Sequence, residues 1–140
     1  MKISIAKEMK RMLYKNLLLI DDDEDDHEIF FSAVADIDEG VTCIGMADAE
    51  HALRKLEAKE LSPEVIFLDL NMPVMSGQEF LVEIKKRPAL NHIPIIIFST
   101  SAHLPTIALT KELGASDFIT KPQKYDQLVE ILTPYISTES

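Results

Sequence analysis

The stretch Leu17-Leu18-Leu19-Ile20-Asp21-Asp22-Asp23-Glu24-Asp25-Asp26 joins four apolar residues directly to six consecutive acids. A short apolar run bounded by polar residues predicts a buried strand, with the acids following its carboxyl end. Carboxylates about 4 Å apart repel by roughly 4 kcal/mol per pair at an effective dielectric of 20. Two interpretations are open from this stretch alone. The acids form a solvated loop, or two of them converge on a divalent cation that takes oxygen ligands, such as Mg²⁺, Mn²⁺ or Ca²⁺.

Length and charge limit the class of protein. The chain has 140 residues, which predicts one domain able to bury a core. Its net charge of -10 argues against a nucleic-acid-binding surface. The one cysteine, Cys43, cannot form an internal disulfide; we expect a small buried hydrophobe and a reducing, cytoplasmic setting. No apolar run approaches the ~20 residues of a membrane span, so no membrane partner is expected.

The first residues differ in charge from the rest. Five basic residues and one acid give residues 1–15 a charge of +4. We expect residues 1–14 to be an extension, either disordered or the result of a mis-assigned start at Met9 or Met12, and residues 15–140 to form the domain. The alternative for the extension is a helical arm that docks on the acidic body or on a partner.

Strands and helices are predicted to alternate along the domain. The expected strands are 15–20, 41–46, 65–68, 93–99 and 116–120. The expected helices begin with 26–37; the second is capped by Asp48 and has a buried stripe that ends at 56, and the third lies between the Ser76–Glu79 capping box and Pro88. The fourth is 104–113, and the fifth is 123–132 or slightly longer, with Pro134 at its end or at a kink. Five β–α units predict a doubly wound α/β fold, in which helices cover both faces of a parallel sheet. Strands that are apolar throughout fit such a sheet.

Ligands of open α/β sheets bind outside the carboxyl ends of the strands. The predicted strands deliver there Asp21 and Asp22, Asp69, Ser99 with Thr100, and Lys121. Three carboxylates, a hydroxyl and an ammonium suit a hard cation together with an anion such as a phosphoryl group. A flavin or dinucleotide fits poorly, because those sites need glycine-rich phosphate-binding loops and the chain has four glycines.

Five motifs in order resemble the receiver domain of two-component response regulators, over residues 15–136. They are Leu-Leu-Ile-Asp-Asp at 18–22, Ile-Phe-Leu-Asp-Leu-Asn-Met-Pro at 66–73 followed by Gly77, Ile-Ile-Phe-Ser-Thr at 96–100, Gly-Ala at 114–115, and Phe-Ile-Thr-Lys-Pro at 118–122. The resemblance implies a flavodoxin-like (βα)5 fold with a five-stranded parallel sheet in the order 2-1-3-4-5.

The resemblance also implies a role for each acid. Asp69 would accept a phosphoryl group as an acyl phosphate. Mg²⁺, which Mn²⁺ could replace, would be held by Asp21, Asp22, Asp69 and the backbone carbonyl of Asn71. Lys121 would pair with Asp69 and then with the phosphoryl oxygens.

A second group of residues is implied as the switch. Ser99 would donate a hydrogen bond to the phosphoryl group, and Ser99, Thr100 and Phe118 would change arrangement with phosphorylation. We expect the Phe118 ring to favour an inward or partner-covered position, since it lacks the more common tyrosine hydroxyl. Pro122 stands at the loop's cis-proline position. Asn71 and Ser101 would tune the phosphoryl lifetime.

The expected function is that of a stand-alone receiver, with no room for an output domain. Its phosphodonor would be a histidine kinase or histidine phosphotransfer protein. It would signal to an unknown downstream protein through the surface of 104–113, 116–120 and 123–132, as a monomer or a weak dimer through that surface. It would catalyse only its own aspartyl phosphorylation and dephosphorylation.

Three alternatives remain. The protein could relay its phosphoryl group rather than end the pathway. A phosphatase of the haloacid-dehalogenase type also uses an aspartyl nucleophile, but it needs Asp-x-Asp, whereas Asn71 follows Asp69-Leu70. A docking-only receiver would lack an acceptor, a metal ligand or the lysine, and none is missing.

Asp23 to Asp26 are expected to be solvated or to begin a helix. The four histidines are expected on surfaces or helix faces.

Overall fold

The computed structural model describes residues 13–136, and within them five strands alternate with five helices. The strands are β1 (Asn16–Ile20), β2 (Thr42–Met46), β3 (Val65–Leu68), β4 (Ile95–Ser99) and β5 (Asp117–Thr120); the helices are α2 (Glu24–Ile37), α3 (Ala49–Glu57), α4 (Gly77–Lys85), α5 (Leu104–Glu112) and α6 (Tyr125–Ile136). All strands pair in parallel, in the order β2-β1-β3-β4-β5. The predicted fold class and strand order are confirmed.

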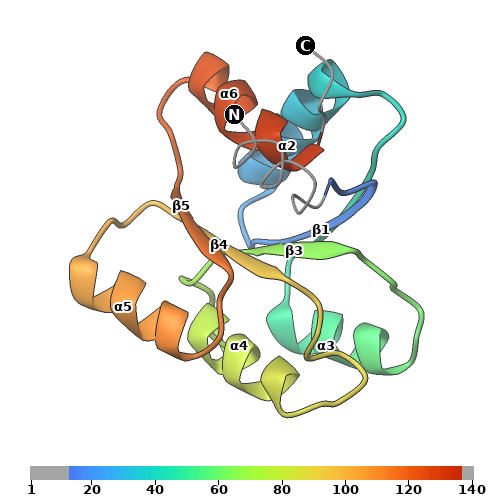
Figure 1. The fold of residues 1–140 in the computed structure, drawn as a ribbon, viewed down its shortest axis with the longest axis vertical. Helices are drawn as coiled ribbons and strands as arrows, with labels where there is room; N and C mark the ends of the chain where they lie inside the picture. Colours follow the sequence, from blue (N-terminus) through green and yellow to red (C-terminus); the bar gives the residue numbers. More distant parts are fainter. Residues whose placement is uncertain (1–12, 137–140) are drawn as a thin grey trace, which may run out of the picture.

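The sheet divides the interior into two layers. Helices α2 and α6 cover one face, and α3, α4 and α5 cover the other (Figure 1). Strand β3 shows why its sequence is apolar throughout: Ile66 and Leu68 belong to the core on the α3–α4 side, whereas Val65 and Phe67 belong to the core on the α2–α6 side. A strand in the middle of a doubly covered sheet buries both of its faces.

The start of α2 is set by its acids. Asp23 is the N-cap, and its carboxylate accepts hydrogen bonds from the backbone N–H groups of Asp25 and Asp26. The three acids that follow lie in the first turn, where the helix dipole favours negative charge. The helix therefore begins two residues before the predicted start at Asp26. The predicted capping box of Ser76 and Glu79 is present at the start of α4.

Helix α6 continues through Pro134 to Ile136, past the predicted end. Proline in a helix removes one intrahelical hydrogen bond. The last turn is held by other contacts, since Ile136 is buried and the backbone N–H of Tyr14 donates to the carbonyl of Tyr135 at 2.9 Å. These contacts offset the lost bond. The expectations for residues 1–12 lie outside the described residues. None of the helices from Leu13 to Ile136 has the length and apolar character to span a bilayer.

Candidate functional site

Backbone hydrogen bonds bring the ends of neighbouring strands level. The N–H of Asp69 donates to the carbonyl of Ile20 at 2.9 Å, so Asp69 follows β3 beside the end of β1. The N–H of Lys121 donates to the carbonyl of Ser99 at 2.6 Å, so Lys121 follows β5 beside the end of β4. The side chains predicted to act together therefore emerge at one edge of the sheet.

The three predicted acids converge at this edge. Asp21, Asp22 and Asp69 each offer a carboxylate oxygen, and these oxygens lie within 4.8 Å of one another. Asp21 is fully buried and Asp69 is 5% exposed, whereas Asp22 is exposed. Oδ1 of Asp21 accepts a hydrogen bond from the N–H of Asp23 at 2.9 Å, and its buried Oδ2 is paired with the ammonium of Lys121 at 2.9 Å. Three carboxylates that converge at a largely buried edge of the sheet fit a hard divalent cation such as Mg²⁺ or Mn²⁺.

Lys121 lies among three carboxylates. Its Nζ is 2.6 Å from Oδ2 of Asp26, 2.9 Å from Oδ2 of Asp21 and 3.8 Å from Oδ1 of Asp69. The contact with Asp26 is a hydrogen bond, and the contact with Asp21 is a close ion pair. The lysine was expected to pair with Asp69, yet that contact is the longest of the three.

Burial shifts the titration of these groups. It raises the pKa of Asp21 to about 6, although Lys121 and the Asp23 N–H act in the opposite direction. Burial also raises the pKa of Asp69, and the charge of Asp22 adds to this. For Lys121, burial lowers the pKa, but the contacts with Asp21 and Asp26 outweigh it, and the pKa lies above its ordinary value. At neutral pH the ionised acids are therefore held at a cost in desolvation, which a bound cation would relieve.

The predicted switch residues lie near the same edge. Ser99 is buried at the end of β4, and its Oγ accepts a hydrogen bond from the N–H of Ser101 at 3.3 Å. Thr100 and Ser101 are exposed. Phe118 is partly buried and packs against the core on the α3–α4 side. Asn71 is exposed, and its N–H donates to Oδ1 of Asp69 at 3.4 Å. The roles of these residues stay predictions.

The expectation of a cis-proline at Pro122 is wrong. No peptide bond within residues 13–136 is cis, so the bond between Lys121 and Pro122 is trans. The trans form is favoured by about 0.5–1 kcal/mol for a bond to proline. The contacts of Lys121 with its three carboxylates are made with this trans bond.

Two neighbours of the site were missed from the sequence. Asp26 was expected only in solvent or at a helix start, yet it hydrogen-bonds Lys121. Placing the N-cap at Asp23 would have made Asp26 the third helical residue, a position that reaches back toward the cap. His27 was expected on a surface or helix face, but it is partly buried and its Nε2 lies 2.5 Å from the carbonyl oxygen of Asp21. No sequence motif marks that contact.

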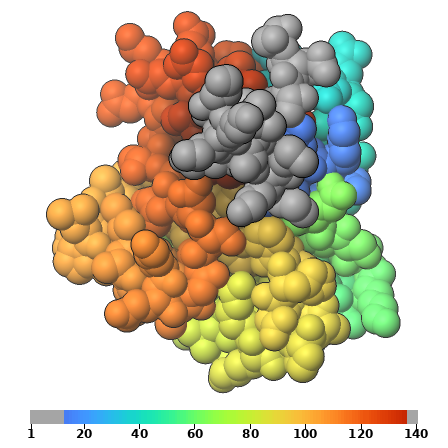
Figure 2. Space-filling view, in the orientation of Figure 1, coloured from blue at the N-terminus to red at the C-terminus, as the bar shows by residue number. Residues whose placement is uncertain are grey.

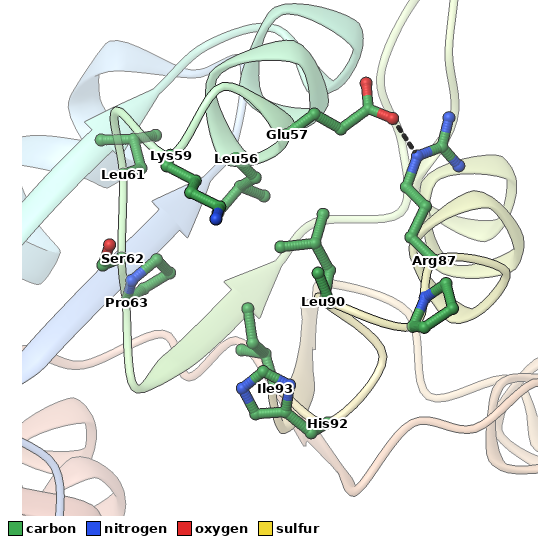
Figure 3. A pocket seen from close by; sticks show the side chains of 12 residues that line it. Leu56, Glu57, Lys59, Leu61, Ser62, Pro63, Arg87, Leu90, His92 and Ile93 are labelled. Atoms are coloured by element: carbon green, nitrogen blue, oxygen red, sulfur yellow. Dashed lines mark hydrogen bonds and ion pairs between the residues drawn. The ribbon is translucent and has the colours of Figure 1, made fainter.

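A separate hollow of about 620 Å³ lies at the opposite end of the sheet (Figure 3). Its lining comes from the connections that lead into β3 and β4, with apolar side chains such as Leu90 and Ile93. Arg87 at its rim is paired with Glu57. It exceeds the open hollow of about 460 Å³ beside Asp22, but contains none of the predicted site residues. The convergent acids and lysine, not the larger hollow, mark the site.

Comparison with known proteins agrees with this geometry. The family of response regulator receiver domains matches residues 17–133. The chain belongs to this family. Receivers of two-component systems in general accept a phosphoryl group, and this chain has the fold and the convergent acids of a receiver.

Individual relatives are similar over part of their length. A protein-glutamate methylesterase/protein-glutamine glutaminase of Treponema denticola is 49% identical over 73 residues, which are 51% of this chain and 18% of the relative. Response regulator Rcp1 of Synechocystis is 34% identical over 70 residues, 50% of this chain and 48% of Rcp1. The matched stretches thus span less than half of either relative.

Solved structures extend the likeness to nearly the whole domain. The phosphorylated cyanobacterial phytochrome response regulator RcpA superimposes with a TM-score of 0.81 at 29% identity, covering 91% of this chain and 97% of RcpA. The Mn²⁺-bound form of Rcp1 superimposes with a TM-score of 0.72 at 24% identity, covering 89% and 97%. The second comparison supports the fold alone.

Proposed function

We propose that this receiver takes a phosphoryl group from a phosphohistidine onto Asp69. The observation that carries the proposal is the convergence of Asp21, Asp22 and Asp69 beside Lys121. A carboxylate oxygen of Asp69 attacks phosphorus, the phosphorus–nitrogen bond to the donor histidine breaks, and an acyl phosphate forms on Asp69. The leaving group is the imidazole of the donor histidine, which remains part of the histidine kinase or histidine phosphotransfer protein.

The neighbouring residues supply electrostatic stabilisation. Mg²⁺ or Mn²⁺, held by Asp21, Asp22, Asp69 and the carbonyl of Asn71, would neutralise charge on the phosphoryl oxygens. Lys121 pairs with a phosphoryl oxygen, and Ser99 donates a hydrogen bond to another. A protein contributes to phosphoryl transfer mainly by such positioning and charge stabilisation. Response regulator Rcp1, which is 34% identical over half of this chain, has a Mn²⁺-bound form, and this supports the proposal of a divalent cation.

The output surface is formed by α5, β5 and α6. In Figure 2 the segments of α5 and β5 lie at one edge of the molecule, continuous with α6 above them. Leu104 is 77% exposed and Leu109 is 45% exposed on α5, and Phe118 lies partly buried on the adjacent strand. Exposed apolar side chains on α5, together with the hollow of about 270 Å³ that Ile107 and Phe118 line, suit docking to a downstream protein. Endpoint signalling and relay of the phosphoryl group would both begin from the acyl phosphate on Asp69.

The phosphatase alternative has less support. Asn71 stands where that class needs its second acid, and its side chain is exposed beside Asp69. A docking-only role has no support from the site, since acceptor, acids and lysine are all in contact.

Incubation with Mg²⁺ and acetyl phosphate, followed by mass spectrometry of the intact protein, tests the proposal. We expect a mass gain of one phosphoryl group in the wild type and in Asp25→Asn, and none in Asp69→Asn. Asp25 is a matched control because it is an exposed acid outside the site. The absence of a gain in the wild type, its persistence in Asp69→Asn, or turnover of a generic phosphatase substrate would contradict the assignment.

A further inference from the structure

We propose that Asp26 is a positioning residue that draws the ammonium of Lys121 away from Asp69, and so keeps Asp69 available to a divalent cation and gives the lysine a partner other than Asp21. This inference rests on the proposed function, because it concerns the same acceptor site. It adds a fourth acid, one that binds neither the cation nor the phosphoryl group but acts through the lysine.

The distances place the lysine between Asp26 and Asp21, whose Oδ2 lies 2.9 Å from Nζ, and leave Asp69 farther away. Nζ of Lys121 is 2.6 Å from Asp26 and hydrogen-bonds it, but it is 3.8 Å from Asp69. A charge-assisted hydrogen bond is about twice as strong as a neutral one. The side chain of Lys121 is 11% exposed and that of Asp26 is 29% exposed, so water screens the pair only in part.

Helix α2 fixes the position of Asp26. The carboxylate of Asp23 caps the helix and accepts the backbone N–H of Asp26 at 3.3 Å. Asp26 therefore stands in the first turn, directly after the loop that carries Asp21 and Asp22. The cap itself is tied to the site, because the N–H of Asp23 donates to Oδ1 of Asp21 at 2.9 Å.

The ammonium of Lys121 and a divalent metal ion would compete for the same carboxylates. Lys121 has three partners, and two of them, Asp21 and Asp69, are expected metal ligands. Without Asp26, the ammonium would pair with those two acids alone and oppose a divalent cation there. With Asp26 present, the lysine keeps a strong partner when Asp21 and Asp69 turn to the metal. The lysine also stays within reach of an arriving phosphoryl group.

The negative charge of Asp26 could also attract a divalent cation directly, through space. The two effects differ in their dependence on Lys121. Positioning requires the cationic side chain at 121, whereas a direct field acts whether or not that cation is present. A double-mutant cycle separates them.

Isothermal titration of the full chain with Mg²⁺, without phosphodonor, is the test. We expect Asp26→Asn to weaken Mg²⁺ binding about fivefold, the size of a change near 1 kcal/mol, and Asp25→Asn to leave it nearly unchanged. In a Lys121→Met background the Asp26→Asn effect should shrink to that of Asp25→Asn. In a Lys121→Arg background, where a cation is kept, it should persist. Thermal melts of each variant confirm folding.

Equal Mg²⁺ affinity in wild type, Asp26→Asn and Asp25→Asn would overturn the inference, as would an Asp26→Asn effect that survives in Lys121→Met. Either result leaves the proposed function standing if acetyl phosphate still modifies Asp69. Conversely, a fivefold loss specific to Asp26→Asn and dependent on Lys121 supports the inference even in a chain that no donor phosphorylates.

Discussion

At the scale of single residues, Gly77 fixes the backbone around the acceptor. Its N–H donates to the carbonyl of Leu70 at 3.1 Å, and it is buried at the start of α4. A Cβ added there would overlap the backbone oxygen of Asp69 and lie 2.7 Å from Cα of Leu70. Backbone atoms cannot move aside as a flexible side chain can, so any relief of this overlap displaces Asp69.

We expect Gly77→Ala to lower the free energy of unfolding by about 1–3 kcal/mol, as overpacking does, and to slow phosphorylation at Asp69 at least about tenfold. Urea unfolding and the rate of mass gain with acetyl phosphate measure the two effects. Gly40→Ala is the control, because its Cβ would meet only the side chain of Asp38, at 3.3 Å. A Gly77→Ala protein that is phosphorylated at the wild-type rate would show that the loop tolerates the shift.

The site residues that were predicted from sequence motifs are those that the order of the strands is enough to bring together. Asp21, Asp69 and Lys121 each follow a strand directly, so a parallel sheet places them at one edge whatever the details of the loops. Asp26 escaped prediction because its direction depends on where α2 begins, and a shift of two residues turns a side chain through much of a helical circle. His27 escaped because its contact needs the space left by Gly45 on the neighbouring strand.

At the scale of elements, the cap of α2 links helix stability to the site. The Asp23 carboxylate holds the first turn, with hydrogen bonds to Asp25 N–H at 2.8 Å and Asp26 N–H at 3.3 Å. Removing an N-cap acid costs about 0.5–2 kcal/mol. Since this turn also carries Asp26, fraying it should loosen the contact with Lys121.

We therefore expect Asp23→Ala to lower the free energy of unfolding by about 1 kcal/mol and also to weaken Mg²⁺ binding. Asp48→Ala is a matched control, since Asp48 caps α3 by accepting the N–H of His51 at 2.8 Å and takes part in none of the ion pairs of Lys121. It should cost similar stability without changing Mg²⁺ affinity. Chemical denaturation and titration calorimetry measure both quantities. If Asp23→Ala binds Mg²⁺ as tightly as Asp48→Ala does, the cap of α2 has no influence on the metal site.

Element boundaries were predicted less well than element types, and tertiary contacts explain the difference. The capping box at Ser76 acts locally, so the start of α4 was predictable. The end of α6 is not local: Ile136 is buried and Tyr135 accepts a hydrogen bond from Tyr14, far away in the chain. Pro134 predicted an end or kink from local rules alone, and the packing of the last turn overrode it.

At the scale of the whole molecule, folding concentrates buried negative charge at one edge of the sheet. The alternation of strands and helices predicted that edge, but not how deeply each acid is buried. Asp21 is fully buried while Asp22, its neighbour in sequence, is exposed. Such a difference depends on the tertiary structure around each side chain, which no local pattern reports.

Burial of Asp21 makes the stability of the molecule depend on pH. Its pKa in the folded chain is raised to about 6 from 3.8, so between these values the folded state binds more protons than the unfolded state. The contribution of Asp21 to stability therefore falls as the pH rises from about 4 to about 6, and stays lost above that range. A cation at the site would restore it, since binding to the folded state alone adds about 2.7 kcal/mol at a hundredfold excess over Kd.

We expect Asp21→Asn, measured without divalent cation, to raise the free energy of unfolding at pH 7 by on the order of 1–2 kcal/mol and to lose most of the stabilisation by Mg²⁺. Asp22→Asn, which removes an exposed acid, should also lose the Mg²⁺ effect but gain little stability. Urea unfolding of the three proteins from pH 4 to pH 7, with and without Mg²⁺, measures this, and the difference between wild type and Asp21→Asn isolates the Asp21 carboxyl. If that difference does not grow between pH 4 and pH 6, the pKa of Asp21 is not raised in the folded chain, and neither desolvation of Asp21 nor its repulsion from neighbouring carboxylates opposes folding.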